Sequence, residues 1–365
     1  MLLWALAAAV GATPTPVARI GDPRLAELSG MVESQRRPGF FWAHNDSGNP
    51  PELFAVASSG RVVAAVPVDA RNDDWEDITI DDSGGLWICD CGNNSNRRDE
   101  LRLLRVPEPD PLRPPERLVP DRVVRFSYRE RQKPRRRGER SHDFDAEALF
   151  FAHGRLWLLT KHRTDSRTVL YRFDDLSGQR PVQPVVAGAW DLGPPASGLT
   201  MVTAADATPD GRRLAVLTYG RILVFEDPGG ESRWLEHPPR EFPLAVSVTR
   251  QTEALAWRLQ GRELWFANEE GALFRQELVL AEPRPAVHRP GNHWPPGFGK
   301  PGRDALRRCR DRTQTYATFA AFAAEGLERA TLIDLPGIGH SVGLAPDVLE
   351  RALDWMESGR REVPP

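Results

Sequence analysis

One short strand pattern occurs five times in the sequence, and this repetition constrains the fold more than any other feature. Each copy is an apolar run with a polar residue at its fifth place, and four of the five copies have Trp at the second place. The copies are residues 41–46, 86–91, 156–161, 214–219 and 264–269. An acidic residue opens an earlier short strand ahead of each copy: Glu27, Glu76, Glu147, Asp206 and Glu253. A unit that recurs every 50 to 70 residues or so predicts a repeat architecture.

Each copy is followed by a third strand pattern, and four copies are followed by a weaker fourth one. The predicted fourth strands are residues 61–68, 122–129, 184–192 and 231–236. Four antiparallel strands joined by short turns make one blade of a β-propeller. The sequence therefore predicts an all-β fold, a β-propeller of five four-stranded blades. A sixth blade stays open as an alternative, because the long stretches 100–141 and 176–205 have room for another unit.

The two ends of the repeat complement each other. The fifth copy lacks a fourth strand, whereas residues 16–20 read as a strand that belongs to no copy. A ring closed by the N-terminal strand hides the two strand edges that an open array exposes. We therefore expect the N-terminal strand to complete the last blade.

The remaining segments suggest how the chain is organised around the propeller. Residues 1–12 are apolar with small residues near their end, which is typical of a signal peptide and predicts a secreted, periplasmic or cell-envelope protein. This run is too short to span a bilayer, and no transmembrane helix is predicted. The propeller is expected at 13–280, a linker rich in Pro and Gly at 281–302, and a small α/β tail at 303–365.

The charge pattern argues against nucleic acid as a partner. The formal net charge is −3, and no basic stripe dominates the sequence. The basic run at 129–140 is interpreted as a solvated loop. The expected partner is a small-molecule or envelope ligand, and nothing in the sequence specifies an oligomeric state.

Three cysteines do not make a disulfide framework. Cys89 and Cys91 are two residues apart, so on a strand their side chains point the same way, in poor geometry for bridging each other. They are therefore interpreted as two unpaired residues of a packed strand.

The five repeated acids are predicted to converge. The first strand of each propeller blade lines the central axis, so Glu27, Glu76, Glu147, Asp206 and Glu253 would form a ring at one mouth of the channel. Carboxylates in close quarters repel one another unless some are protonated or a cation neutralises them. A flexible ring of carboxylates favours Ca²⁺, the cofactor predicted here. In the alternative, each acid accepts backbone N–H groups of the neighbouring blade and holds the repeat together.

A second group of polar residues lies in the first three blades and predicts a one-sided ligand pocket. The candidates are His44, Asn45, Asp46, Asp90, Asn93, Asn94, Asp145 and Lys161. They follow or precede the repeated strands, where loops meet at one end of a blade. Asn, Asp and Gly at such places also form Asx-turns with no other role. For residues 44–46 and for Asp90, Asn93 and Asn94 the binding role is favoured, whereas Asp73, Asp81 and Asp82 are interpreted as turn residues.

These motifs resemble a family of secreted bacterial β-propeller proteins described as WD-repeat-like or phytase-like. The resemblance rests on segments 27–30, 44–48, 74–77, 90–94, 145–149 and 251–255, in order, and covers about residues 20–278. It implies the propeller fold, but the chemistry of the family is not settled. More distantly the chain is similar to calcium-dependent propeller hydrolases, in which a cation on the axis polarises an ester, lactone or phosphoester. That similarity implies Glu27, Glu76, Glu147 and Glu253 as ligands, with Asp206 in place of a Glu.

The tail contains a hydrolase-like motif in the wrong context. Residues 339–343 match the Gly-x-Ser-x-Gly nucleophile elbow around Ser341, but Pro336 and Gly337 interrupt the strand that should precede it, and no His follows. About the last 65 residues instead resemble the C-terminal end of an α/β-hydrolase, with His340 in the place of the triad base. The sheet core of that fold is missing, so we predict that the tail is not a complete hydrolase.

Three functions follow from these features, and whether the protein is an enzyme stays open. The first is a ligand-binding or scaffold propeller with an axial cation site. The second is a calcium-dependent hydrolase of small esters or phosphoesters, with His44 or His142 as the base. The third, less favoured, is serine hydrolysis by the tail through His340.

Overall fold

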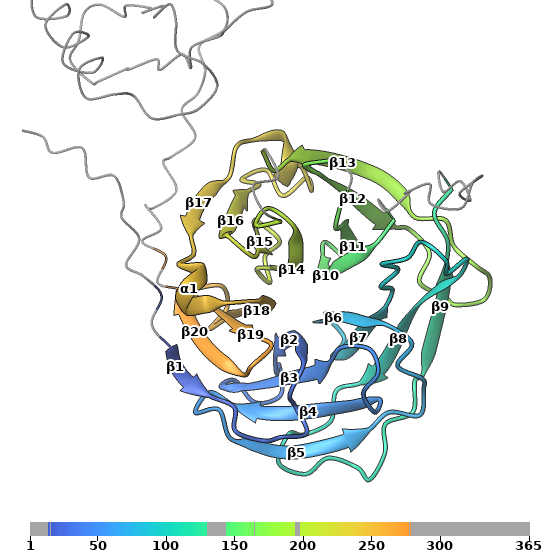
Figure 1. Cartoon of the computed structure of the whole chain (residues 1–365). Helices are drawn as coiled ribbons and strands as arrows, with labels where there is room; N and C mark the ends of the chain where they lie inside the picture. Colours follow the sequence, from blue (N-terminus) through green and yellow to red (C-terminus); the bar gives the residue numbers. More distant parts are fainter. Residues whose placement is uncertain are drawn as a thin grey trace, which may run out of the picture. The chain divides into compact units, whose positions relative to one another are not determined.

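A computed structural model of the chain describes residues 14, 16–129, 144–163, 165–193, 198–276 and 278. In this part, five four-stranded antiparallel sheets follow one another around a common axis (Figure 1). The predicted β-propeller of five blades is confirmed. The predictions for the signal peptide, His142, the basic run after Arg129, the linker and the tail with His340 and Ser341 lie outside the described residues.

Each of the first four blades is built in chain order from its innermost to its outermost strand. Blade one contains β2 (Leu28–Glu33), β3 (Phe40–Asn45), β4 (Glu52–Ala57) and β5 (Val62–Pro67). Blade two contains β6 (Trp75–Ile80), β7 (Gly85–Asp90), β8 (Leu101–Pro107) and β9 (Arg122–Phe126). Blade three contains β10 (Ala146–Ala152), β11 (Arg155–Thr160), β12 (Arg167–Phe173) and β13 (Val185–Asp191). Blade four contains β14 (Val202–Ala207), β15 (Arg213–Thr218), β16 (Arg221–Glu226) and β17 (Arg240–Pro243).

The fifth blade combines both ends of the propeller. It contains β18 (Thr252–Arg258), β19 (Glu263–Asn268), β20 (Ala272–Gln276) and, as its outermost strand, β1 (Pro16–Arg19). β1 pairs antiparallel with β20, and the N–H of Ile20 donates to the carbonyl of Gly271 at 2.8 Å. The predicted ring closure by the N-terminal strand is therefore confirmed.

The apolar core lies between the blades. One cluster of buried side chains occupies each of the five interfaces between neighbouring blades. Because both faces of a blade are covered, its strands are continuous apolar runs rather than alternating ones. The repeated tryptophans of the second strands, Trp42, Trp87, Trp157 and Trp265, are all buried at these interfaces. This packing is the physical reason for the repeated pattern in the sequence.

Blade four differs from its prediction at both edges. Asp206 does not open the innermost strand but is the fifth residue of β14, whose apolar residues are small and give a weak pattern. The predicted fourth strand at 231–236 is wrong as well. Trp234–Glu236 form a short 3-10 turn, in which Trp234 is buried and donates to the carbonyl of Gly211. The fourth strand, β17, follows it.

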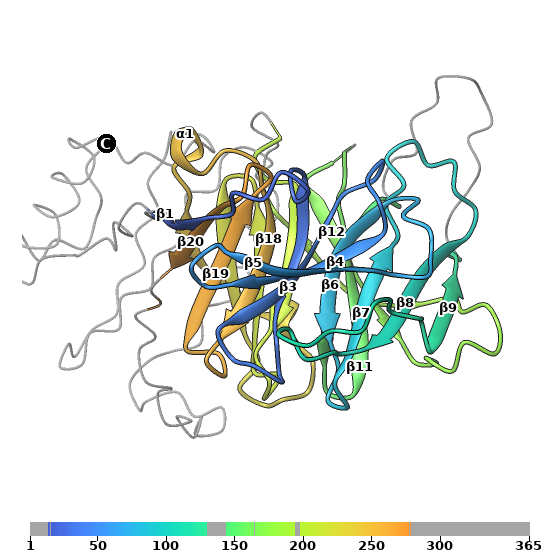
Figure 2. The same ribbon diagram turned by 90° about the horizontal axis from the view of Figure 1, so that it is seen from below.

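The prediction of two unpaired cysteines is wrong. Cys89 and Cys91 are joined by a disulfide, with their Cα atoms 5.1 Å apart. β7 ends at Asp90, so Cys91 no longer follows strand geometry and its Cα comes within the usual bridging range. A short helix, α1 (Val246–Thr249), precedes β18 and lies at one end of the ring (Figure 2). Within the described residues, no helix is long and apolar enough to cross a membrane.

Candidate functional site

The five innermost strands share a local irregularity at the mouth of the ring where they begin. Each strand has a β-bulge near its start, at which the pairing register to the second strand shifts. The second residues of these strands, which lie at the bulges, are Ser29, Glu76, Glu147, Thr203 and Glu253. A bulge leaves a residue unpaired and re-aims its side chain. Three of the five positions therefore carry a carboxyl at the same depth of the mouth.

A second set of side chains precedes the strands. The residues immediately before them are Glu27, Asp74, Asp145, Met201 and Gln251. Asp74 and Glu76, like Asp145 and Glu147, are two positions apart, the spacing at which strand side chains share a face. Blade four has no acid at either place. The acids are therefore concentrated in blades two and three, on one side of the mouth.

Glu76 lies at the centre of this acidic cluster. Its carboxyl forms one group with Asp46 and Asp74, and a second group with Asp145 and Glu147. Within each group the carboxyl oxygens lie within 4.8 Å of one another. Glu76, Asp145 and Glu147 are buried, whereas Asp46 and Asp74 are half-buried. We call these five residues the acidic cluster.

Two cations lie on one side of the acidic cluster. Lys161 Nζ is 3.1 Å from Glu147 Oε2, and Arg163 Nη2 is 2.9 Å from Asp145 Oδ2. Both cations follow β11 in blade three. Within the described part of the chain, no Lys or Arg forms an ion pair with Asp46, Asp74 or Glu76. Among the described residues, the ion pairs of the acidic cluster thus lie at blade three, and none lies towards blades one and two.

The electrostatics of the acidic cluster disfavour its full ionisation. Burial, followed by the charges of Glu147, Asp46 and Asp145, raises the pKa of Glu76 well above its usual range. Burial and then the Asp46 carboxylate raise the pKa of Asp74 to about 6. The pKa of Glu147 is also raised by burial, although Lys161 opposes the shift. Either protons or a bound cation must compensate carboxyls arranged in this way.

Gly92 has no side chain, and this leaves room for the carboxyls of Glu76 and Asp74. A Cβ at this position would be 1.9 Å from Glu76 Oε1 and 2.6 Å from the Asp74 carboxyl. Gly92 follows Cys91, so the disulfide holds the chain directly before this close approach. The backbone of residue 92 therefore forms one wall of the acidic cluster, and any side chain there would displace the carboxyls.

The donor set of the acidic cluster is suited to a hard divalent cation. All five residues offer carboxylate oxygens, which are the ligands that Ca²⁺ and Mg²⁺ prefer. No His or Cys belongs to the groups, which argues against zinc-type coordination. Thus the buried carboxyls of the acidic cluster allow a metal site at this mouth.

The predicted ring of five acids is only partly assembled. Glu76 and Glu147 come together as expected. Glu253 lies at the same mouth but accepts a hydrogen bond from Tyr219 Oη at 2.6 Å. Glu27 occupies the outer position and accepts one from Asn49 Nδ2 at 2.6 Å. Asp206 lies deeper in the channel, where it accepts the backbone N–H of Trp257 at 2.8 Å.

Several predicted ligand-binding residues hold the loops of the mouth together. Asn45 Oδ1 accepts the N–H of Glu27 at 3.0 Å. Asp90 is buried and forms ion pairs with Arg98 and Arg102. Asn93 donates its N–H to Asp145 Oδ1 at 2.7 Å and so positions one member of the acidic cluster. Asn94 contacts Arg163 through its side-chain oxygen. Among the predicted ligand-binding residues, Asp46 and Asp145 belong to the acidic cluster, and Lys161 forms an ion pair with it.

The geometry around His44 does not favour a role as base. The ring is fully buried, with Nδ1 3.0 Å from the carbonyl of Asn45, and packs edge-on against Trp75. Burial lowers the pKa of His44 to about 4, so the ring is neutral at neutral pH. His44 belongs to β3 and packs against Gly30 of β2 and Trp75 of blade two, which is the place of a packed core residue.

Sequence reasoning missed Asp74, Gly92, Arg163 and Tyr219 as residues of the site. The signal for Asp74 was the repeated acid-x-Glu spacing of Asp74–Glu76 and Asp145–Glu147. The sequence pattern predicts that Glu27 corresponds to Glu76, whereas the observed strand pairing aligns Glu27 with Asp74. No comparable signal marks Gly92, because its role depends on a contact between loop and strand.

No protein-family model matches the chain, and no curated protein matches it. Among solved structures, the chain is similar to a glutaminyl cyclase from Myxococcus xanthus, with 11% identity, 72% of this chain and 95% of that chain covered, and a TM-score of 0.44. It is also similar to the calcium-binding protein regucalcin from Agrobacterium tumefaciens str. C58, with 12% identity, coverage of 73% and 92%, and a TM-score of 0.37. For a candidate 6-phosphogluconolactonase from Bacteroides uniformis ATCC 8492, identity is 12%, coverage 66% and 63%, and the TM-score 0.34. These overall similarities are too low to carry an argument about this chain.

Proposed function

We propose that this protein is an exported, ligand-binding β-propeller that holds a calcium ion in the acidic cluster. One observation carries the proposal. Glu76 is only 5% exposed, and it belongs to both sets of neighbouring carboxyls that make up the acidic cluster. No described Lys or Arg forms an ion pair with it. A buried carboxylate costs several kcal/mol unless it is compensated. A cation between the two groups compensates Glu76 together with Asp46 and Asp74, with which no described Lys or Arg forms an ion pair.

Calcium fits this place better than magnesium. Ca²⁺ accepts six to eight oxygen ligands in irregular geometry, whereas Mg²⁺ demands a near-ideal octahedron. The five carboxyls come from three blades and from both strands and loops, an arrangement without octahedral symmetry. Asp46 and Asp74 are half-buried, so water can complete the coordination from the open side.

Two features support export. Residues 1–12 have the apolar, small-residue character of a signal peptide. The Cys89–Cys91 disulfide is of a kind that persists mainly in oxidising compartments outside the cytosol. The ordered motifs between residues 27 and 255 support membership of the secreted, phytase-like propeller family. The ligand of such a protein is a small molecule or an envelope component that binds at the mouth.

Calcium-dependent hydrolysis of a small ester or phosphoester is the second candidate function. The observation that favours it is the position of Lys161 and Arg163 beside the acidic cluster, because a cation and fixed positive groups can stabilise a developing oxyanion. When bound, calcium would supply Lewis acidity at this place. Lys161 would hold Glu147 in position, and Arg163 would orient Asp145.

Metal content tests the first proposal. Purified protein is analysed for bound calcium, and its melting temperature is measured with calcium and with chelator. At a free calcium concentration about 100 times the dissociation constant, binding stabilises the fold by about 2.7 kcal/mol. We expect Glu76→Gln to abolish this calcium-dependent shift and to stabilise the metal-free protein, because a repelled buried charge is removed. Glu226→Gln, at the exposed end of β16, is the matched control and should keep the shift.

The outcomes separate the two candidate functions. Absence of bound calcium together with an unchanged melting temperature in chelator would contradict the calcium site and with it both candidates. Calcium-dependent turnover of p-nitrophenyl acetate or p-nitrophenyl phosphate that Glu76→Gln removes would establish the hydrolase. Calcium binding without such turnover would support the ligand-binding propeller.

A further inference from the structure

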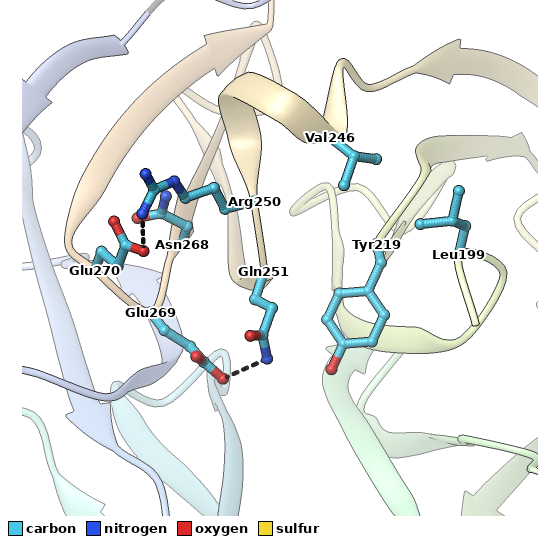
Figure 3. A pocket seen from close by; sticks show the side chains of 8 residues that line it. All are labelled: Leu199, Tyr219, Val246, Arg250, Gln251, Asn268, Glu269 and Glu270. Atoms are coloured by element: carbon cyan, nitrogen blue, oxygen red, sulfur yellow. Dashed lines mark hydrogen bonds and ion pairs between the residues drawn. The ribbon is translucent and has the colours of Figure 1, made fainter. Parts of the chain in front are cut away.

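A cavity of about 410 Å³ lies at the same mouth, between blades four and five. Figure 3 shows its side chains. One wall is formed by Leu199, Tyr219 and Val246, and the opposite wall by Arg250, Gln251, Asn268, Glu269 and Glu270. Cavities of a few hundred Å³ with an apolar wall and a small number of polar groups are typical sites of small molecules. The cavity belongs to blades four and five, whereas the acidic cluster belongs to blades one to three.

The polar wall contains a carboxyl without a cationic partner. Glu269 follows β19, is half-buried and accepts a hydrogen bond from Gln251 Nε2 at 3.2 Å. Within the described residues, no Lys or Arg forms an ion pair with it. Burial, followed by the carboxylates of Asp46 and Glu27, raises the pKa of Glu269. Glu270, in contrast, is already paired with Arg250.

The rim of the cavity is held in a strained conformation. Arg250, the residue directly after α1, has φ 56° and ψ −141°, a backbone region that is occupied almost only by glycine. Its neighbours hold it there: Asn268 Nδ2 donates to the carbonyl of Thr249 at 3.1 Å, and the N–H of Glu269 donates to the carbonyl of Gln251 at 3.0 Å. Strain of this kind costs about 1–3 kcal/mol and clusters at ligand-binding places. The strained turn aligns Gln251 and Glu269 on one wall.

We propose that this cavity binds a small organic ammonium compound, with its apolar body against Leu199, Val246 and Tyr219 and its cationic group against Glu269. The carboxylate supplies the charge, and the amide oxygen of Gln251 supplies a further acceptor. A neutral ligand would leave Glu269 half-buried and uncompensated, and an anion would add to the repulsion from Asp46 and Glu27. The cavity therefore selects by charge as well as by shape. This binding does not depend on calcium in the acidic cluster.

The experiment uses the full chain and three probes of nearly the same size: benzylamine, benzyl alcohol and benzoate. Binding is measured by ligand-observed NMR or calorimetry in the presence of chelator, so that no metal competes for the carboxyls. We expect benzylamine to bind at least ten times more tightly than benzyl alcohol, which corresponds to about 1.4 kcal/mol, and benzoate to bind weakest. Glu269→Gln should lower the affinity for benzylamine to that for benzyl alcohol.

A matched variant makes the test specific. Glu226→Gln removes an exposed carboxyl at the far end of β16 and should leave the preference for benzylamine unchanged. Equal binding of benzylamine and benzyl alcohol by the wild type would overturn the proposal. So would a preference for benzylamine that survives Glu269→Gln. Because the measurement is made in chelator, failure of the calcium site leaves this result unaffected.

Discussion

Two carboxyls next to each other in the sequence, Glu76 and Asp77, lie in opposite environments. Both are buried at the bulge of β6. Asp77 faces down the channel and accepts backbone N–H groups of Ile78 at 2.8 Å, Leu149 at 2.9 Å and Ala205 at 3.3 Å. Glu76 faces the mouth, where no described backbone N–H donates to its carboxyl and other carboxyls surround it. Buried acids therefore occur at two depths of the same channel with different partners.

The difference shows that both interpretations of the repeated acids are realised, each at its own depth. Deep in the channel, Asp77 and Asp206 accept backbone N–H groups of other blades and hold the innermost strands together. At the mouth, Asp145 accepts the N–H of Asn93, whereas no described N–H of another blade donates to the carboxyls of Asp46, Asp74, Glu76 or Glu147. In β6 the bulge places the neighbouring acids Glu76 and Asp77 in these two different roles.

The largest expected effect comes from removing the deep acceptor. Asp77→Ala leaves up to three buried N–H groups without a partner, each of which costs about 1–3 kcal/mol. We expect the free energy of unfolding to fall by about 3–5 kcal/mol, while the calcium-dependent shift in melting temperature is retained. Urea denaturation with and without calcium measures both quantities. A variant of near wild-type stability that no longer responds to calcium would instead place Asp77 in the cation site.

A substitution at the mouth should cost less stability than Asp77→Ala but should remove the calcium response. Gly92→Ala places a Cβ within 1.9 Å of Glu76 Oε1 and must displace the carboxyls of Glu76 and Asp74. Overpacking of this kind costs about 1–3 kcal/mol. The calcium-dependent shift should be lost, because Glu76 belongs to both groups of the acidic cluster. Thermal denaturation with and without calcium checks this expectation.

Gly21→Ala is the control for Gly92→Ala. A Cβ at residue 21 would have no atom within 4 Å, and the backbone there is not in the left-handed region. Stability and calcium response should both stay at wild-type values. A calcium response that persists in Gly92→Ala would mean that the cation does not sit between Asp74 and Glu76.

The fold could be predicted because its packing repeats in the sequence. Trp42, Trp87 and Trp157 mark the same position of three blades, and interfaces on both faces make each strand a continuous apolar run. Blade four lacks this Trp, since Ala215 takes its place, and the innermost strand is made of small residues. The predicted strand start at Asp206 therefore lies three residues beyond the bulge at Thr203. Where packing uses small side chains, the pattern becomes too weak to set boundaries.

The site could be predicted only in part, because its alignment depends on strand pairing. Glu27 and Glu76 both precede a repeated strand, yet the bulges put Glu27 level with Asp74. The Cys89–Cys91 bridge depends on the end of β7, which the apolar pattern does not reveal. Gly92 and the cavity beside Tyr219 arise from loops that meet only in the folded ring. Residue types and their repetition predict which end of the ring carries the site. They do not predict how deep in the channel each acidic side chain lies.

A further expected effect concerns the second deep acid, Asp206, and appears only as a dependence of stability on pH. Burial raises the pKa of Asp206 to about 7, although the N–H groups of Trp257 and Ala207 oppose the shift. An unfolded Asp loses its proton near pH 4, so between about pH 4 and 7 the folded protein holds a proton that the unfolded chain has released. Stability from this group is fully present below pH 4 and decreases as the pH rises through 7.

Asp206→Asn removes this contribution and so isolates it. We expect the stability difference between wild type and variant to change by at most about 1.4 kcal/mol per pH unit between pH 4 and 7, in the direction that favours the variant as the pH rises. The nearby carboxyls of Glu33 and Asp77 are present in both proteins, so their titration largely cancels in the difference. Urea denaturation of both proteins at pH 4.5, 6 and 7.5 measures it. A difference that does not vary with pH would mean that the backbone donors keep Asp206 ionised, and that the deep acids hold the blades together as charged rather than protonated groups.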